Sequence, residues 1–539
     1  MVRHPIAIGV ALLLAAVFAV HPSTSASAAA PVVQTTEGPV QGLSANGMNQ
    51  FLGVPYATPP VGPLRWQPPK PHAAWTQPLA ATSFGKTCAQ ITELGVFAGP
   101  VSVNEDCLFL NVFTPAGAKK LPVLVWIHGG GLVDGESNDY DASALVKGGP
   151  AVLVTINYRL GLLGYLAHPA LDAEGHDFGN YGLMDQQEAL RWVHRNIAAF
   201  GGDPGNVTVG GQSAGATSTA AVMISPASAG LLHRAIFESG PLLTVAPLAL
   251  AESRGTAFAT AAGCGPDAAC LRALSVPKIL SLQGTAAANG PYVTGLIVDG
   301  TVLPIPGDTA WSTGQFNHMP IMNGGVKDEG GFSTSINELF FGPLSPEQYT
   351  EIVTKTYSGP AGPGNGPPNY KPGTAEAVLA KYPLSAYPNP SAAWIAVGSD
   401  ANVCRHPTLN NNASKFVPLY AYEFADRQAP WYFPPLSFAH GAAHTIDIQF
   451  LFPDWHGGPL GASHKLTAQE QTLSRLLVIA WTNFMYTGNP NRTGDKPWPR
   501  YTAGSAVYLT QNVPAPSQMP AANFVAAHNC AFWDTVLIY

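Results

Sequence analysis

The sequence predicts an α/β fold, built on a mostly parallel β-sheet with helices on both faces. Two continuous apolar runs, residues 122–127 and 151–156, are suited to strands buried on both sides. The spacing of apolar residues over 183–200 predicts a helix, which ends at Gly201 and the turn residues after it. A short β-branched strand at 207–209 follows. Strands that alternate with helices in this way are typical of a parallel sheet.

Further segments extend this pattern along the chain. Residues 51–66 carry so many prolines that we expect a turn-rich entry segment there rather than a central strand. The Pro/Gly-rich stretch 358–374 is expected to be a loop insertion. More strands are expected at 105–112, 235–238, 319–323 and 419–424, and a long late helix at 468–486. No internal repeat or interdomain linker is evident, so residues 31–539 are expected to form a single domain.

The composition indicates a globular protein with a sparsely charged surface. The 539-residue chain is 46% hydrophobic and 11% charged, and its 56 glycines and 50 prolines indicate many loops. Its formal net charge of −7 offers no basic face, so nucleic acid is not an expected partner. The oligomeric state cannot be derived from these features and is left open.

The first thirty residues have the features of a signal peptide. Arg3 and His4 form a short basic start, and an apolar run of about fifteen residues follows at 6–20. That run is shorter than the ~20 residues that a membrane-spanning helix needs. Small residues around Ala28 and Ala30 offer cleavage sites. We therefore expect residues 1–30 to be removed on export, the mature protein to be secreted, and no transmembrane segment to remain.

Export makes the six cysteines interpretable. An even number of cysteines in an oxidising compartment favours disulfide bonds. Cys264 and Cys270 are close enough in sequence to form a local bridge. Six cysteines allow 15 pairings, so counting leaves the other four open.

A strand, a sharp turn and a helix follow one another around Ser213. The strand at 207–209 leads into the G-x-S-x-G sequence of residues 211–215, and a helix rich in small residues is expected at 214–224. The flanking glycines are expected because a Cβ at either place would clash. Ser213 would then lie at the positive end of the helix, with its hydroxyl clear of the sheet. This arrangement is the nucleophile elbow of an α/β-hydrolase fold.

An oxyanion-binding loop is the expected role of the glycines that follow the strand at 122–127. The sequence His128-Gly-Gly-Gly lets the main chain face inward, and we expect the backbone N–H groups of Gly130, Gly131 and Ala214 to bind the oxyanion. A plain flexible glycine turn is the alternative. A phosphate-binding loop is disfavoured because no Lys-Ser/Thr pair follows.

A general base and its acid partner should follow in the order Ser, acid, His. Asp328 and Glu329 adjoin at the end of the strand expected at 319–323, and either could be the acid. Among the histidines, His444 precedes an apolar run and is the best candidate, with His440 as its rival. These residues leave both choices open.

The chain resembles the type-B carboxylesterases, the family of cholinesterases, liver carboxylesterases and some fungal lipases. The resemblance covers nearly all of the mature chain and is strongest around the elbow. Its motifs lie at residues 51–66, 105–112, 126–131, 157–161, 179–187, 211–215, 326–330, 481–490 and 530–533. It implies an α/β-hydrolase fold with large loop and helical insertions around an active-site gorge.

The resemblance also implies roles for individual residues. It selects Glu329 over Asp328 and His444 over His440, which completes a Ser213–Glu329–His444 triad. A serine hydrolase of this kind acts on a small-molecule ester and needs no metal or cofactor. The implied disulfides are Cys88–Cys107, Cys264–Cys270 and Cys404–Cys530. The implied structural ion pairs are Arg65–Glu105 and Arg159–Asp185.

Three departures from the family pattern bear on the substrate. Gln212 stands before the nucleophile where the family usually has Glu, which removes a negative charge beside the triad. The loop closed by Cys88 and Cys107 contains no Trp, and Phe97 is its only aromatic residue. In cholinesterases this loop carries a Trp that stacks on the cationic substrate. The first two changes favour neutral esters over choline esters. Leu132 replaces a common Phe, which is expected to widen the pocket slightly.

Two alternatives to a neutral carboxylesterase remain at this point. One is a lipase or sterol esterase for long acyl chains, which the sequence does not separate from the first interpretation. The other is a non-catalytic binding protein on the same fold. Such relatives usually lack the nucleophile, so the presence of Ser213, Glu329 and His444 together disfavours it.

Overall fold

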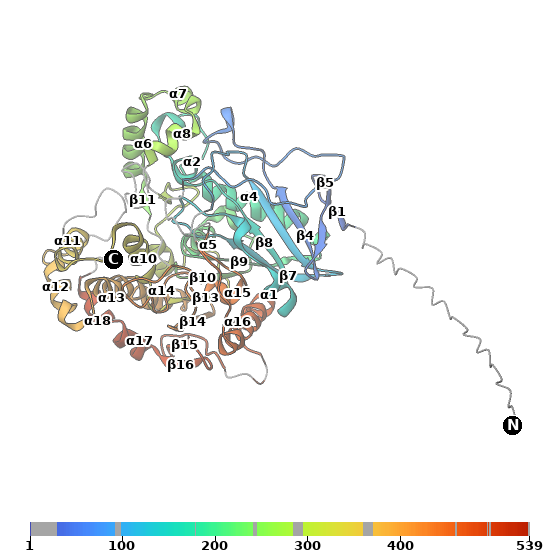
Figure 1. Ribbon diagram of the computed structural model, residues 1–539. Coiled ribbons are helices and arrows are strands. Elements are labelled where there is room, and N and C mark those ends of the chain that lie inside the picture. The colour runs from blue at the N-terminus through green and yellow to red at the C-terminus, as the bar shows by residue number, and fades with distance from the viewer. Residues whose placement is uncertain are drawn as a thin grey trace.

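The computed structural model describes residues 1, 30–91, 99–177, 179–240, 245–283, 295–358, 370–458, 461–492, 494 and 497–536 (Figure 1). Nearly all of the expected signal peptide, and Phe97, lie outside these residues. So does most of the insertion expected at 358–374.

An eleven-stranded sheet forms the centre of the molecule, in the order β16-β15-β14-β13-β10-β9-β7-β8-β6-β4-β3. The pairs from β8 to β15 are parallel, whereas the pairs at both ends of the sheet are antiparallel. The strands are β3 (Leu43–Ala45), β4 (Met48–Pro55), β6 (Phe109–Pro115), β7 (Leu121–Ile127), β8 (Val152–Ile156), β9 (Gly202–Gln212), β10 (Arg234–Glu238), β13 (Ile321–Val326), β14 (Leu419–Phe424), β15 (Val507–Gln511) and β16 (Ser517–Pro520). Two small sheets join β1 (Val32–Gln34), β2 (Pro39–Gln41) and β5 (Leu79–Ala80), and β11 (Ala246–Pro247) with β12 (Ile297–Val298). The prediction of an α/β fold on a mostly parallel sheet is confirmed.

Helices connect and cover the strands (Figure 1). They are α1 (Ser143–Gly148), α2 (Gly161–Tyr165), α3 (Pro169–Asp172), α4 (Tyr181–Asn196), α5 (Ala214–Ile224), α6 (Leu248–Ala262), α7 (Ala268–Ala273), α8 (Val276–Gln283), α9 (Gly307–Thr313), α10 (Gly331–Phe341), α11 (Pro346–Tyr357), α12 (Thr374–Lys381), α13 (Pro390–Val403), α14 (His406–Ala413), α15 (Ile448–Leu451), α16 (Ala468–Thr487), α17 (Ala521–Ala527) and α18 (Cys530–Val536). Figure 1 shows α6, α7 and α8 grouped at one end of the molecule, with α11, α12 and α13 at another.

The residues of β7 alternate between two hydrophobic clusters, one on each face of the sheet. Val123 and Val125 belong to the cluster that contains residues of α4 and α5. Leu124 and Trp126 belong to the cluster that contains residues of α1 and α16. Alternate side chains of a strand point to opposite faces, so a strand covered on both sides is apolar throughout. This is why 122–127 reads as a continuous apolar run.

Two expected segments differ from the structure. The first part of 51–66 belongs to β4, which pairs with β3 and β6 near the edge of the sheet, so the expectation that the whole segment is a turn-rich entry was wrong there. The register of β4 shifts between Phe51 and Val54, so the strand tolerates the irregular sequence at Gly53. The strand expected at 105–112 begins only at Phe109. Cys107 and Glu105 are engaged in cross-links instead.

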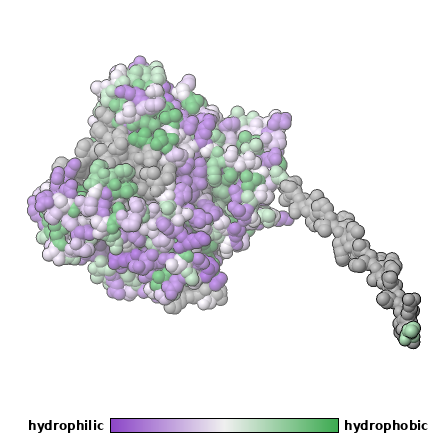
Figure 2. Space-filling view, viewed as in Figure 1, coloured by the Kyte–Doolittle hydropathy of each residue, from purple (hydrophilic) through white to green (hydrophobic). Residues whose placement is uncertain are grey.

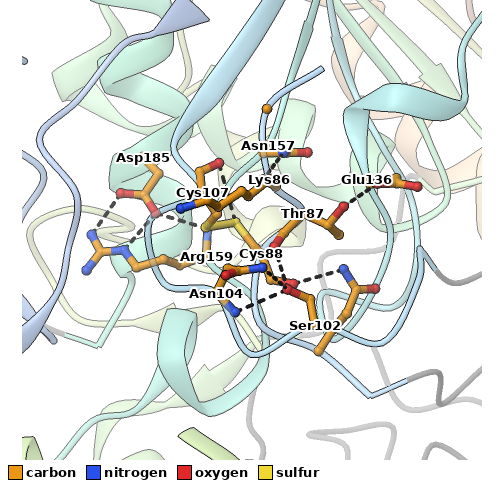
Figure 3. Close-up of a disulfide and its surroundings, with 12 residues drawn as sticks. Lys86, Thr87, Cys88, Ser102, Asn104, Cys107, Glu136, Asn157, Arg159 and Asp185 are labelled. Atoms are coloured by element: carbon orange, nitrogen blue, oxygen red, sulfur yellow. Dashed lines mark hydrogen bonds and ion pairs between the residues drawn. A yellow bond between two sulfur atoms is a disulfide. The ribbon is translucent and has the colours of Figure 1, made fainter. Parts of the chain in front are cut away.

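These cross-links range from a local bridge to one that joins distant parts of the sequence. The disulfides are Cys88–Cys107, Cys264–Cys270 and Cys404–Cys530, the pairs that the family resemblance implies. The guanidinium of Arg65 donates two hydrogen bonds of 2.6 Å to Glu105. Arg159 donates two of 2.8 Å to the fully buried Asp185, as Figure 3 shows. Both pairs are bidentate, which fixes the geometry of the segments that they join.

The surface shows hydrophilic and hydrophobic residues interspersed over the face drawn in Figure 2. At the end of α10, Phe340 and Phe341 are exposed.

Among the described residues, no helix has both the length and the apolar character that crossing a bilayer requires.

A buried histidine ties the C-terminal helices to the sheet. The ring of His528, between α17 and α18, contacts Asp400 of α13 through Nδ1 at 3.1 Å and Glu423 of β14 through Nε2 at 2.6 Å. A carboxylate only accepts hydrogen bonds, so the ring satisfies both partners when it is doubly protonated. Burial lowers the pKa of His528, but the two carboxylates outweigh burial and raise this pKa to about 9.

Stability should therefore fall as the pH rises through about 9. The charged imidazole contributes fully below its unfolded pKa of ~6.5, and the contribution is lost once the folded-state pKa is passed. We expect His528→Gln to lower the free energy of unfolding at pH 6 by about 3 kcal/mol, with less than half of that deficit left at pH 9.5. Urea denaturation at both pH values measures this. The exposed His194, replaced by Gln, is the control. An equal deficit at both pH values would contradict the assignment of charge.

Candidate active site

Ser213 occupies a strained turn between β9 and α5. Its backbone dihedral angles, φ 58° and ψ −124°, are rare for a residue other than glycine. The Ser213 N–H donates to the carbonyl oxygen of Glu238 at 2.8 Å, which fixes the turn against the neighbouring strand β10. The residue stands directly before the first turn of α5, where unpaired N–H groups produce a positive potential.

The glycines on either side of Ser213 are required by close contacts between backbones. A Cβ added to Gly211 or Gly215 would fall on the carbonyl oxygen of Ile127, the last residue of β7. Neither glycine can therefore be replaced without moving the strand beside it. The sequence predicted a clash at these two positions, and the structure identifies β7 as the element that causes it.

The glycine loop after β7 lies against the turn that holds Ser213. A Cβ added to Gly129 would lie 3.2 Å from the Cβ of Ser213, and Gly129 and Gly130 line the same pocket as Ser213. Gly130 and Gly131 have φ values of 103° and 63°, which favour glycine. Among the hydrogen bonds of the described residues, none uses the backbone N–H of Gly130, Gly131 or Ala214. These donors are free to bind a negative oxygen.

His444 and Glu329 form a short hydrogen bond beside this turn. His444 Nδ1 lies 2.5 Å from Glu329 Oε2, and the other carboxylate oxygen accepts the Val326 N–H at 3.1 Å. Glu329 follows β13, and His444 precedes α15. His444 lines the same pocket as Ser213. On its other side, His444 Nε2 lies 3.3 Å from the side-chain nitrogen of Gln212.

The two rival residues have other partners. Asp328 receives hydrogen bonds of 2.8 and 2.6 Å from Arg427 and one of 2.8 Å from the Ala442 N–H. His440 contacts the Gly441 carbonyl through Nδ1 at 2.6 Å and stacks on Trp431 at 5.3 Å. Neither rival lines the pocket of Ser213. Neither rival is therefore placed to act on Ser213.

The sequence also matches a known protein family. A profile of the carboxylesterase family matches residues 29–533. The chain belongs to the carboxylesterase family. Family membership makes it a carboxylic ester hydrolase.

Relatives of the chain match over almost their whole lengths. The medium-chain fatty acyl-CoA hydrolase precursor of Anas platyrhynchos is 32% identical over 532 residues, 91% of this chain and 90% of that protein. The para-nitrobenzyl esterase of Bacillus subtilis (strain 168) is 33% identical over 482 residues, 87% of this chain and 92% of that protein. The solved structure of a thermophylic PNB esterase superposes with a TM-score of 0.75 at 30% identity, covering 93% of this chain and 99% of that chain.

The pocket of this carboxylesterase has an apolar wall that the sequence did not reveal. Its aromatic and aliphatic side chains come from Tyr140, Phe332, Ile448 and Trp455. Tyr140 and Trp455 are stacked at 5.1 Å, and the ring of Phe332 lies 5.9 Å from that of His444. The four residues come from segments spread over more than three hundred positions, so no local pattern identifies them.

Two acidic residues form another part of the wall, and sequence reasoning missed them as well. Glu136 accepts hydrogen bonds from the Thr87 hydroxyl, as Figure 3 shows, and from Asn138 at 3.0 Å. Burial, and then the neighbouring Glu136, raise the pKa of Asp139 to about 8. At neutral pH Asp139 is therefore mostly protonated. Their signal in the sequence is only their place just after the glycine loop.

Further buried carboxyl groups, which do not line the pocket, interact with His444 or with one another. Burial lowers the pKa of His444, but the charge and hydrogen bond of Glu329 outweigh it, so the pKa is raised overall. Burial, with Glu329 next, raises the pKa of Asp447 to about 7. Burial, followed by Asp447, raises the pKa of Glu238 well above its ordinary range, and Trp481 donates to Glu238 at 2.8 Å. Within the described part of the chain, no group of three or more His, Cys, Asp or Glu could hold a metal ion.

The contact at Ile127 can be tested through protein stability. We expect Gly215→Ala to lower the free energy of unfolding by more than about 2 kcal/mol, because the added methyl group must displace the end of β7. Thermal or urea unfolding measures the effect. Gly504→Ala is the matched control, since a Cβ there meets nothing within 4 Å. Similar stabilities for the two variants would show that β7 yields readily at this point.

Proposed function

We propose that this carboxylesterase is a secreted serine hydrolase that cleaves neutral carboxylic esters through an acyl-enzyme on Ser213. The hydrogen bond between Glu329 and His444, made in the pocket that contains Ser213, carries the proposal. Gly130, Gly131 and Ala214 supply the unpaired N–H groups that such a reaction uses.

The proposed reaction has two halves. His444 Nε2 takes the proton of Ser213 as Oγ bonds to the ester carbonyl carbon, and the carbonyl oxygen becomes negative. His444 then gives that proton to the leaving alcohol as the ester C–O bond breaks. Water, deprotonated by the same nitrogen, then attacks the acyl carbon. His444 returns that proton to Ser213 Oγ as the bond between Oγ and the acyl carbon breaks, which releases the acid and restores the serine. Glu329 keeps the imidazole in the required tautomer and stabilises its charged form. No step needs a metal or cofactor.

The walls of the pocket support a neutral substrate. Tyr140, Phe332, Ile448 and Trp455 offer apolar contacts to an acyl or alcohol group. Gln212 brings no charge next to His444. The Glu136 carboxylate disfavours a substrate with a carboxylate near the ester, because like charges repel in a buried site. Secretion is supported by the signal-like residues 1–30 together with the disulfides.

Paired substitutions test the assignment of the triad. We expect Ser213→Ala to lower kcat by at least about 10⁴-fold and to abolish labelling by a fluorophosphonate probe. Glu329→Gln should lower kcat by about 10³–10⁴-fold, because the amide no longer fixes the imidazole tautomer. Asp328→Asn changes the adjacent carboxylate, which faces Arg427, and should leave kcat within about threefold. A loss at Asp328 as large as that at Glu329 would contradict the assignment.

A substrate panel tests the specificity. Rates against p-nitrophenyl esters from acetate to oleate should be highest below about ten acyl carbons, because the described pocket is lined closely by Tyr140, Phe332 and Trp455. A maximum at longer chains would favour a lipase or sterol esterase instead. A hemisuccinate ester should react at least about tenfold more slowly than the butyrate ester of the same alcohol. Equal rates would show that the Glu136 carboxylate does not face the bound substrate.

A further inference from the structure

Gln212 occupies the space between His444 and the glycine loop. It is the last residue of β9 and is 1% exposed. Its side-chain nitrogen lies 3.3 Å from His444 Nε2. Its side-chain oxygen is directed to the other side, where a Cβ added to Gly129 would come within 3.3 Å of it. The amide therefore lies directly beside the atom that has to accept the proton of Ser213.

The hydrogen-bonding chemistry gives this contact a direction. His444 Nδ1 faces the Glu329 carboxylate, which can only accept, so Nδ1 carries a proton. A neutral imidazole has one N–H, so Nε2 then has a free lone pair. The Gln212 amide donates an N–H to this lone pair. If the ring gains a second proton, two donors face each other, and the contact is lost unless the amide turns over.

The other polar groups near His444 act in the opposite sense. The carboxylates of Glu329 and Asp447 both favour the protonated imidazole. The Glu136 carboxylate lies on another wall of the same pocket, whereas Asp139 beside it is mostly protonated below its pKa of about 8. Burial of the ring opposes these groups, but the pKa of His444 is raised overall. A base that stays protonated cannot accept the proton of Ser213, so a partner that favours the neutral ring extends activity to lower pH.

We propose that Gln212 is a positioning residue of the esterase. Its amide holds His444 as the neutral tautomer with Nε2 unprotonated, and so sets the lowest pH at which the base works. The inference rests on the proposed roles of Ser213 and His444. The proposal gives the Gln of the G-Q-S-A-G turn an effect besides the one on substrate charge. A carboxylate at this position, as the family usually has, would accept where Gln212 donates and would raise the pKa of His444, so the base would need a higher pH.

Two near-isosteric variants separate charge from hydrogen bonding. Gln212→Glu replaces the donor by an anion, and Gln212→Met removes the donor without adding charge. The kcat/KM for p-nitrophenyl butyrate is measured from pH 5 to pH 9. For Gln212→Glu we expect the acidic limb to move up by about one pH unit, a tenfold loss at pH 5.5 to 6, with the plateau near pH 9 kept within about threefold. Gln212→Met should move it the same way by a smaller amount, about a two- to threefold loss.

A second readout keeps this test separate from the proposed function. The pKa of His444 is measured directly in the resting protein by NMR of labelled histidine, with His444→Gln to assign the signal. An upward shift of the His444 pKa in Gln212→Glu supports the proposal. It does so even if a fluorophosphonate fails to label Ser213, because that failure rejects only the esterase mechanism.

An unchanged or lowered pKa overturns the proposal. A uniform loss of activity at every pH also overturns it, because such a loss indicates a packing role only.

Discussion

The site depends on a close approach of backbones at the ends of two parallel strands. β7 and β9 pair in register up to Ile127 and Gly211, and the Ile127 carbonyl leaves no room for a side chain at Gly211 or Gly215. The glycine loop leaves β7 and the Ser213 turn leaves β9 at this same point. The N–H groups of the glycine loop and the hydroxyl of Ser213 are therefore neighbours, because β7 and β9 are neighbouring strands. The loops after β13 and β14 complete the site at the same edge of the sheet, where open α/β sheets bind their ligands.

The second constraint is electrostatic. The buried Glu329 and Asp447 act on His444, and a buried negative charge is costly unless it is paired. Protonation reduces that cost, which is why the pKa of Asp447 is raised to about 7 and that of Asp139 to about 8. The imidazole therefore lies in an environment whose negative charge grows as the pH rises through the neutral range, because these carboxyl groups lose their protons there. In such an environment a neutral side chain next to Nε2, such as Gln212, has more influence than it would have in water.

The local features of the site could be predicted from the sequence, whereas its walls could not. The helix expected at 214–224 and the strand at 419–424 have the predicted bounds, because glycine punctuation and apolar runs determine them locally. Glu329 and Asp328 are adjacent, so nothing local separates them. The two carboxylates differ in the structure because Arg427, which is 99 residues away in the sequence, donates hydrogen bonds to Asp328. The limits of the strands near Phe51 and Phe109 also depend on residues far away in the sequence, because pairing between β4 and β6 determines them. The sequence therefore misplaced these limits.

The first disulfide shows how a distant cross-link can shape the pocket. Cys88–Cys107 joins two residues that are 19 positions apart, which restricts the unfolded chain and fixes the residues next to Cys88. On one side, the Thr87 hydroxyl donates to Glu136 (Figure 3). On the other, the Gln90 side chain accepts from the Gly135 N–H at 2.8 Å and donates to its carbonyl at 3.0 Å. Two successive residues of the acidic wall segment, Gly135 and Glu136, are thus hydrogen-bonded to residues on either side of Cys88. Buried polar groups need such partners, and Glu136 could not remain beside Asp139 without them.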